Sequence, residues 1–128
     1  MKTVLIIEDE KPLSDAIRAK LDSAGFVTVT ARSVDQALEY LKNSVKIDAV
    51  WLDHYLFGER NGVDFVTLLR KKEAIQKDLP IFVVSNTVSP DKIRMYLKLG
   101  VKKCYTKVDF RLDEIISDIK RVMKWKKY

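Results

Sequence analysis

Carboxylate, hydroxyl and amine side chains stand at the ends of four short apolar runs in this sequence. They belong to Glu8, Asp9, Asp53, Ser85 and Lys107. Runs that are apolar at nearly every position are typical of parallel strands covered on both faces. Because the carboxyl ends of parallel strands gather at one edge of a sheet, where open α/β sheets bind their ligands, we expect these side chains to lie close together.

This set of side chains meets the requirements for transfer of a phosphoryl group to a carboxylate. Glu8, Asp9 and Asp53 would repel one another without a counter-charge, and Mg²⁺ prefers a few carboxylates, retained waters and phosphate oxygens. An aspartate beside Mg²⁺ can attack a phosphoryl group and form an acyl phosphate. Ser85 and Lys107 would then offer a hydroxyl and an ammonium group to the phosphoryl oxygens.

Each residue also has a simpler interpretation when it is taken alone. Glu8 and Asp9 could cap the helix that follows them, and Asp53 could be an ordinary loop hydrogen-bonder. Ser85 could be a strand-end hydroxyl, and Lys107 a solvated charge among many. The ordered combination of all of them favours a common site.

Hydrophobic spacing predicts five strands that alternate with five helices. The strands are expected at residues 3–7, 26–31, 49–52, 80–85 and 101–106. The expected inward residues of the helices are Leu13, Ala16, Ile17, Leu21 and Ala24, then Ala37, Leu38 and Leu41, then Phe65, Val66 and Leu69, then Ile93, Tyr96 and Leu97, and finally Leu112, Ile115, Ile116, Ile119, Val122 and Met123. The alternation implies a single doubly wound α/β domain with a parallel sheet and right-handed crossovers.

Local signals mark several helix ends. Ser33 to Gln36 has the pattern of a capping box, and Gly25 and Gly100 are expected to stop the helices before them. The basic run 70–72 is expected in the last turns of the helix that follows Gly62, where cations offset the helix dipole.

The composition indicates one globular domain. At 128 residues the chain can bury a core, and its 47% hydrophobic and 33% charged residues are typical of a folded protein. No apolar run approaches the roughly 20 residues of a membrane span, and the acidic start argues against a signal peptide. The single cysteine, Cys104, allows no internal disulfide, which suits the cytoplasm.

The net charge of +6 is concentrated toward the C-terminal end. Residues 90–128 contain 12 Lys and Arg against 5 Asp and Glu. Such a balance could favour nucleic acid or an acidic partner. Solvated outer faces of two helices explain it equally well.

Five stretches in order resemble the receiver domain of two-component response regulators, of the chemotaxis-regulator kind, over essentially the whole chain. They are residues 4–10, 50–53, 61–62, 83–85 and 100–107. The resemblance implies a flavodoxin-like fold whose five-stranded parallel sheet has the order 2-1-3-4-5. It also implies that residues 1–128 form one receiver domain without an output domain.

The resemblance assigns roles to individual residues. Asp53 would be the phosphoacceptor and one of the Mg²⁺ ligands. Asp9 would ligate Mg²⁺ directly, Glu8 chiefly through water, and Tyr55 through its backbone carbonyl. Ser85 would be the switch hydroxyl that moves to the phosphoryl group. Lys107, which is carried over in the same way, would pair with the phosphoryl oxygens.

The sequence departs from the family pattern near these residues. Val108 replaces the usual proline after Lys107, and a cis bond before a non-proline costs about 2.5–4 kcal/mol, so a trans or strained loop with a differently aimed lysine is expected. Cys104 falls at the position of the switch aromatic, and Tyr105 faces the other side of the strand. Asn86 is larger than the usual residue and would narrow access to the phosphoryl group. The loop between Asp53 and Gly62 is also about one residue longer than usual.

Two functions from different classes follow. In the first, a histidine kinase or phosphotransfer protein donates a phosphoryl group to Asp53, and the change is passed to a downstream protein through residues 90–128. The domain is then a monomer or weak homodimer, has no contact with membranes, and is no enzyme beyond assisting its own phosphorylation. In the second, the fold is a phosphorylation-independent interaction domain whose basic C-terminal face binds nucleic acid or an acidic partner.

Four further side chains are assigned to packing or to the surface. His54 is the only histidine and has no Cys or His partner at metal-ligand spacing, so we expect a loop or packing residue rather than a zinc ligand or a phosphodonor. Cys104 is expected to be small and buried. Trp125 and Tyr128 could stack on bases, although a frayed amphipathic end explains them as well.

Overall fold

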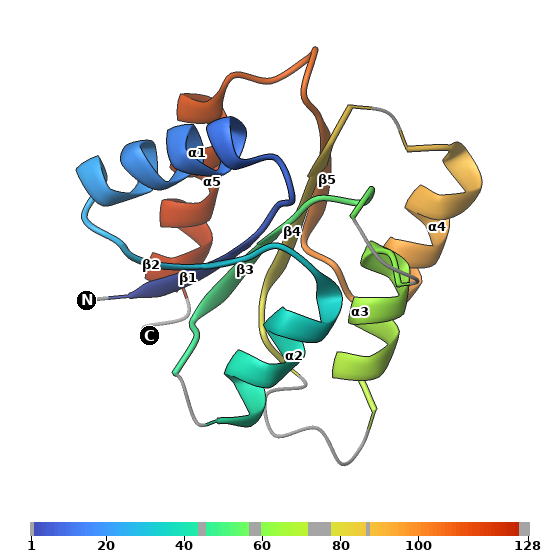
Figure 1. Ribbon diagram of the computed structural model, residues 1–128. Coiled ribbons are helices and arrows are strands. Elements are labelled where there is room, and N and C mark those ends of the chain that lie inside the picture. Colours follow the sequence, from blue (N-terminus) through green and yellow to red (C-terminus); the bar gives the residue numbers. More distant parts are fainter. Residues whose placement is uncertain (1, 44–45, 57–59, 72–77, 87, 126–128) are drawn as a thin grey trace.

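A parallel sheet of five strands forms the centre of the molecule, with helices on both of its faces (Figure 1). The computed structural model describes residues 2–43, 46–56, 60–71, 78–86 and 88–125. The elements are β1 (Thr3–Ile7), α1 (Lys11–Ser23), β2 (Val27–Ala31), α2 (Val34–Lys42), β3 (Ala49–Leu52), α3 (Gly62–Leu69), β4 (Ile81–Ser85), α4 (Pro90–Lys98), β5 (Lys103–Thr106) and α5 (Leu112–Trp125).

The strand order is β2-β1-β3-β4-β5, and every neighbouring pair is parallel. The predicted fold class and strand order are therefore confirmed. β3 and β4 are buried along their whole length, as their apolar runs predicted. β2 lies at an edge and is only partly covered, which agrees with its alternation of polar and apolar residues.

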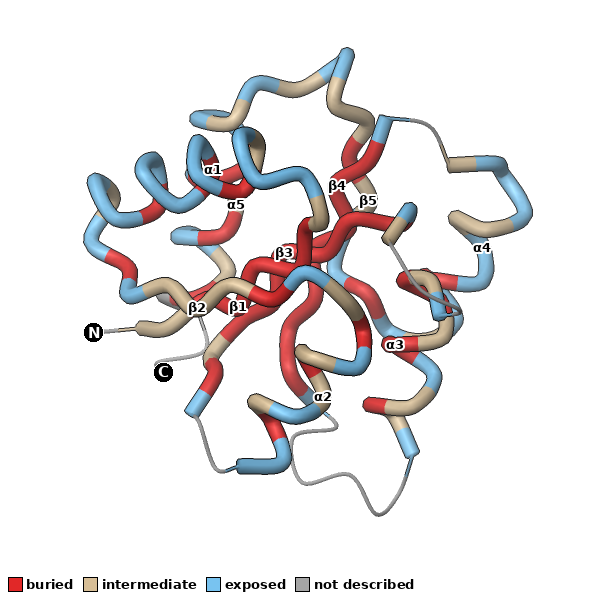
Figure 2. The backbone as a smooth tube through the Cα atoms, viewed as in Figure 1, coloured by how far each residue is buried: buried red, intermediate tan, exposed pale blue. Residues whose placement is uncertain are grey.

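Alternate residues of the strands point into two separate cores. On one face, residues such as Leu5, Val50 and Val83 pack beneath α2, α3 and α4. On the other face, residues such as Ile6 and Trp51 pack beneath α1 and α5. Figure 2 shows the buried strands between helices that are exposed on their outer sides. Because all neighbouring strands between these two helical layers are parallel, their carboxyl ends meet at one edge of the sheet.

The predicted helix stops and several inward residues are confirmed. Gly25 and Gly100 have φ values of +94° and +83°, which a residue with a side chain rarely adopts, and each lies just beyond the end of its helix. Ile115, Ile116 and Ile119 of α5 are buried in the α1 and α5 core. None of the helices in the described residues is long and apolar enough to cross a membrane.

Four local predictions are wrong. Ala16 was expected on the inner face of α1, but it is exposed, and Ser14 is buried on that helix instead. Leu97 was expected on the inner face of α4, but it is 53% exposed because α4 turns mainly Tyr96 toward the sheet. α3 ends at Leu69, so Arg70 lies at the C-cap instead of in the last turn. The side chain of Gln36 accepts from Arg32 N at 2.7 Å and not from the N-cap amide, so only half of that capping box forms. Lys72 lies outside the described residues.

Candidate functional site

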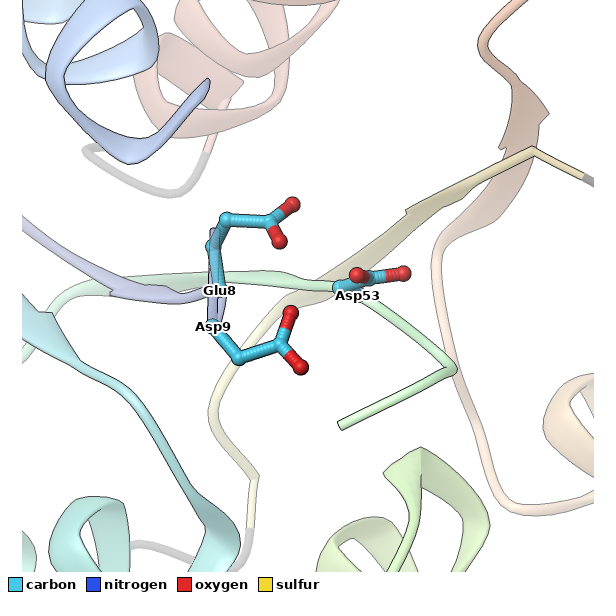
Figure 3. Close-up of side chains that lie close together, drawn as sticks. All are labelled: Glu8, Asp9 and Asp53. Atoms are coloured by element: carbon cyan, nitrogen blue, oxygen red, sulfur yellow. The ribbon is translucent and has the colours of Figure 1, made fainter. Parts of the chain in front are cut away.

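Three carboxylates meet beyond the ends of β1 and β3. Figure 3 shows Glu8 and Asp9 from the first strand beside Asp53 from the third. One carboxylate oxygen from each residue lies within 4.8 Å of the other two. Glu8 and Asp53 are buried and Asp9 is half-buried. The predicted convergence of these three acids is therefore present in the structure.

Backbone hydrogen bonds between strands fix the positions of two of the acids. Asp53 N donates to Ile7 O at 3.0 Å, and Glu8 N donates to Ala31 O at 3.0 Å. Both bonds continue the parallel ladders one step beyond the strands. The acids are thus held by the sheet itself, which keeps them in place despite their mutual repulsion.

Burial and the repulsion of a neighbouring acid both act on the Glu8 carboxyl. Burial, followed by the charge of Asp53, raises the pKa of the Glu8 carboxyl from 4.5 to about 7, against the opposing effects of the Glu10 amide and of Lys107. A carboxylate in this condition gains from a nearby cation. Oxygen donors of this number and charge suit Mg²⁺, so Glu8, Asp9 and Asp53 could hold the ion.

Ser85 and the backbone of Tyr55 both donate to the same oxygen of Asp53. Ser85 Oγ donates to Asp53 Oδ1 at 2.9 Å, and Tyr55 N donates to the same atom at 3.3 Å. Ser85 is buried at the end of β4, directly across the sheet edge from Asp53. The predicted hydroxyl is therefore in contact with the Asp53 carboxylate.

Lys107 reaches into the same group of acids. Its backbone N donates to Ser85 O at 2.9 Å, which places the residue one step past β5. Its Nζ lies 3.3 Å from Glu8 Oε1 and 3.9 Å from Asp53 Oδ2. Val108, which follows it, is 84% exposed, and no cis peptide bond occurs in the described part of the chain. With a trans bond after it, Lys107 still points at the acids, but its nearest partner is Glu8.

The residue after Asp53 makes a buried contact that the sequence did not reveal. His54 Nδ1 and the hydroxyl of Tyr96 share a hydrogen bond of 2.5 Å, and both residues are buried. Burial, together with the charge of nearby Lys92, lowers the pKa of His54, which favours the neutral form of the ring. The packing role expected for His54 agrees with this. The available signal was Tyr96 itself, because a buried tyrosine hydroxyl needs a hydrogen-bond partner.

The two residues in the middle of β5 face opposite cores. Tyr105 packs in the α1 and α5 core, and its hydroxyl donates to Asp118 Oδ2 of α5 at 2.8 Å. Cys104 is half-buried against the opposite core, and burial raises its thiol pKa to about 11. Tyr105 is therefore turned away from Asp53, as strand alternation predicted. Asn86, the other departure next to the site, is exposed.

The remaining sequence predictions concern residues that the structure does not describe. Residues 57–59 of the loop after Asp53 lie outside the described residues, as do 126–128 and the side chains of 124–125. The end of that loop next to α3 is held by a helix cap. Asn61 caps α3 by accepting from Asp64 N at 3.1 Å, while Asp64 accepts from Asn61 N at 2.8 Å. This reciprocal capping box fixes the point at which the loop enters the helix.

Comparison with known proteins gives a consistent result. The family model for the response regulator receiver domain matches residues 4–120. The phosphate regulon transcriptional regulatory protein PhoB of Klebsiella pneumoniae is 32% identical over 124 residues, which are 96% of this chain and 52% of that protein. The transcriptional regulatory protein DltR of Streptococcus agalactiae is 32% identical over 91% of this chain and 50% of its own. The chain thus spans about half the length of these relatives.

Solved structures agree in fold. The Francisella response regulator 1452 receiver domain has a TM-score of 0.85 and 25% identity, covering 98% of this chain and 99% of that one. A CheY-like receiver domain protein from Methanospirillum hungatei has a TM-score of 0.88 at 16% identity, covering 99% and 97%. At 16% identity, the similarity to the Methanospirillum hungatei protein shows only that the two chains share a fold.

Proposed function

The chain belongs to the response regulator receiver domain family, and we propose that Asp53 is the residue at which it accepts a phosphoryl group. The observation that carries the proposal is the convergence on Asp53 of a hydroxyl, an amine and two further carboxylates. Ser85 Oγ lies 2.9 Å from Asp53 Oδ1, and Lys107 Nζ lies 3.9 Å from Asp53 Oδ2. If these residues were only helix caps, loop hydrogen-bonders or solvated charges, their side chains would not need to lie close together.

In the proposed reaction, a carboxylate oxygen of Asp53 forms a bond to the phosphorus of a phosphohistidine. The phosphorus–nitrogen bond of the donor breaks, and its electron pair stays on the imidazole nitrogen, which then takes a proton. Glu8, Asp9 and Asp53, with the backbone carbonyl of Tyr55, would hold Mg²⁺, and the bound ion would supply positive charge to the phosphoryl oxygens. Lys107 exchanges its contact with Glu8 for a phosphoryl oxygen, and Ser85 donates to another.

The partners in this role are a histidine kinase or phosphotransfer protein upstream and a protein bound through residues 90–128 downstream. The chain acts as a signalling phosphoacceptor that assists only its own phosphorylation and dephosphorylation. The curated relatives are about twice as long and are named transcriptional regulatory proteins. Whether this receiver controls a further domain or a separate protein does not alter the chemistry proposed at Asp53.

The alternative function, binding of nucleic acid through the basic C-terminal face, has less support. Three of its described basic residues pair with carboxylates on the same face: Arg94 with Asp91, and Lys103 and Arg121 with Asp118. Binding that grows steeply as salt is lowered, and that is the same for phosphorylated and free protein, would favour this alternative.

The test is the intact mass of the protein after incubation with acetyl phosphate. We expect a gain of one phosphoryl group that requires Mg²⁺ and is absent from the Asp53→Asn variant. Asp15→Asn is the matched control, since Asp15 is an exposed aspartate of α1 that pairs only with Lys11 at 3.0 Å among the contacts described for it. An adduct of equal yield in Asp53→Asn, or none in the unmodified protein, would contradict the proposal.

A further inference from the structure

We propose that the buried hydrogen bond between His54 and Tyr96 couples the state of Asp53 to the position of α4. In this arrangement Tyr96 is a positioning residue that transmits the change and takes no part in the chemistry. The inference rests on the proposed function of Asp53 and adds the route by which a change there leaves the site. Four features of the described residues carry it.

The first feature is how α4 is attached to the domain. The structure describes every residue of α4, and Tyr96 is the only one that is buried. Met95 and Leu97 on either side of it are 41% and 53% exposed. Because Tyr96 is the only buried side chain of α4, the part of the helix around it should follow that side chain when it moves.

The second feature is where the Tyr96 side chain ends. Its hydroxyl lies 2.5 Å from His54 Nδ1, and His54 is bonded covalently to Asp53. The two rings meet edge to face, with centroids 5.6 Å apart. Both groups are buried, so the hydrogen bond has no competing water, and losing it would leave two polar groups without a partner. Tyr96 is therefore held to the segment that carries the acceptor carboxylate.

The third feature is the space left for this contact by Gly62. A Cβ atom at Gly62 would lie 2.3 Å from the Tyr96 hydroxyl, 3.2 Å from His54 Cα and 3.3 Å from Asp53 O. Gly62 N also donates to His54 O at 3.1 Å. The first residue of α3 thus packs directly on the contact, and only the absence of a side chain there admits the tyrosine.

The fourth feature is that the C-terminal end of α4 is held independently. Arg70, at the C-cap of α3, donates from Nε to Leu99 O at 2.8 Å and from Nη2 to Gly100 O at 3.3 Å. These bonds join the two residues that follow α4 to the C-cap of α3. A displacement that enters through Tyr96 would therefore turn α4 about its C-terminal end, and the end near Ser85 would move most.

The other buried tyrosine near the sheet edge offers no such route. The Tyr105 hydroxyl donates to Asp118 of α5, on the face of the sheet opposite α4. Cys104, the residue before it, packs on the α4 face but has only a short side chain. When Asp53 gains a phosphoryl group, the donors on its Oδ1, Ser85 and Tyr55 N, must rearrange around new oxygens. His54 lies between Asp53 and Tyr55, so its ring and Tyr96 take part in that rearrangement.

The test compares amide hydrogen exchange in α4 between free and phosphorylated protein, for the unmodified chain and for Tyr96→Phe. Phenylalanine keeps the buried ring and removes only the hydroxyl. We expect both proteins to gain the phosphoryl group, and the phosphorylation-dependent change in α4 exchange to shrink about fivefold or more in Tyr96→Phe. His54→Leu, which removes the partner instead, should give the same loss.

Tyr105→Phe is the matched control, because it deletes a buried tyrosine hydroxyl bond on the opposite face. It should leave the α4 response unchanged. An unaltered response in Tyr96→Phe, or an equal loss in Tyr105→Phe, would overturn the proposal.

A second arm does not depend on phosphorylation. Exchange in α4 is measured for Asp53→Asn, Tyr96→Phe and the double variant. Coupling predicts that the effect of Tyr96→Phe differs about fivefold or more between the two backgrounds, whereas additive effects would overturn it. If no phosphoryl group is gained, the proposed function of Asp53 fails, and this arm still decides the coupling.

Discussion

Lys107 Nζ lies nearer to Glu8 than to Asp53, at 3.3 Å from Glu8 Oε1 and 3.9 Å from Asp53 Oδ2. The Glu8 side chain is 1% exposed and that of Lys107 is 20% exposed. In the resting domain the amine therefore acts mainly as the counter-charge of a buried acid. A cation bound by Glu8 would release the amine toward Asp53, which links metal binding to readiness for the phosphoryl group.

Removing this counter-charge should destabilise the domain. Lys107→Met keeps most of the side-chain volume but leaves Glu8 without its ion pair. We expect the free energy of unfolding at pH 8, without Mg²⁺, to fall by about 1–3 kcal/mol, less than for a fully enclosed pair because Lys107 is partly exposed. Urea denaturation measures this. The loss should shrink at pH 5, where Glu8 is protonated, and an equal loss at both pH values would contradict the ion-pair account.

The raised pKa of Glu8 gives a second prediction. The folded protein binds the Glu8 proton more tightly than the unfolded chain, with a pKa of about 7 against 4.5. Between these values the folded state carries more protons, so the Glu8 contribution to the free energy of unfolding decreases as pH rises from about 4.5 to about 7 and is constant above. The difference between the unmodified protein and Glu8→Gln, measured without Mg²⁺, should show this slope.

Magnesium affinity should depend on the same proton. Mg²⁺ binds the ionised carboxylate, so protonation of Glu8 competes with the ion. We expect the affinity, measured by calorimetry, to weaken as pH falls below about 7. In Glu8→Gln this part of the pH dependence should be absent and the affinity lower throughout. A pH dependence that is unchanged in Glu8→Gln would mean that another group is responsible.

The sequence was sufficient for the sheet and for the acids because both follow from strong local patterns. Apolar runs such as 49–52 and 81–84 are typical of buried strands, and their parallel order brings Asp53 and Ser85 to one edge. No sequence pattern predicted that His54 is the partner of Tyr96. The two residues are 42 positions apart, and His54 lies in a loop with no regular pattern. The predicted burial of Leu97 failed because the helical stripe of α4 is too short to define which side packs inward.

Gly62 should tolerate no side chain while Tyr96 keeps its hydroxyl. In Gly62→Ala the added Cβ would lie 2.3 Å from that hydroxyl, so we expect a loss of about 1–3 kcal/mol in the free energy of unfolding. Adding Tyr96→Phe removes the colliding atom and should recover part of the loss. Thermal or urea denaturation of the two single variants and the double variant measures this. Strictly additive losses would show that the clash lies elsewhere, with the nearby backbone of His54.

The Ser85 hydroxyl should affect how fast the protein is phosphorylated, but not which residue is phosphorylated. Ser85→Ala removes the donor that lies 2.9 Å from Asp53 Oδ1. We expect the adduct still to form on Asp53 from acetyl phosphate, about tenfold or more slowly. Ser85→Thr, which keeps a hydroxyl, is the matched control and should retain most of the rate. Equal rates in the alanine and threonine variants would leave the hydroxyl without a role in the transfer.

Chemical trapping can identify the residue that carries the phosphoryl group. Protein treated with acetyl phosphate and Mg²⁺ is reduced with borohydride, which converts an acyl phosphate of aspartate to homoserine, and is then digested and sequenced by mass spectrometry. If Asp53 accepts the phosphoryl group, homoserine appears at position 53 alone, and only when Mg²⁺ was present. Homoserine at Asp9 or at another aspartate, with position 53 unchanged, would contradict this assignment.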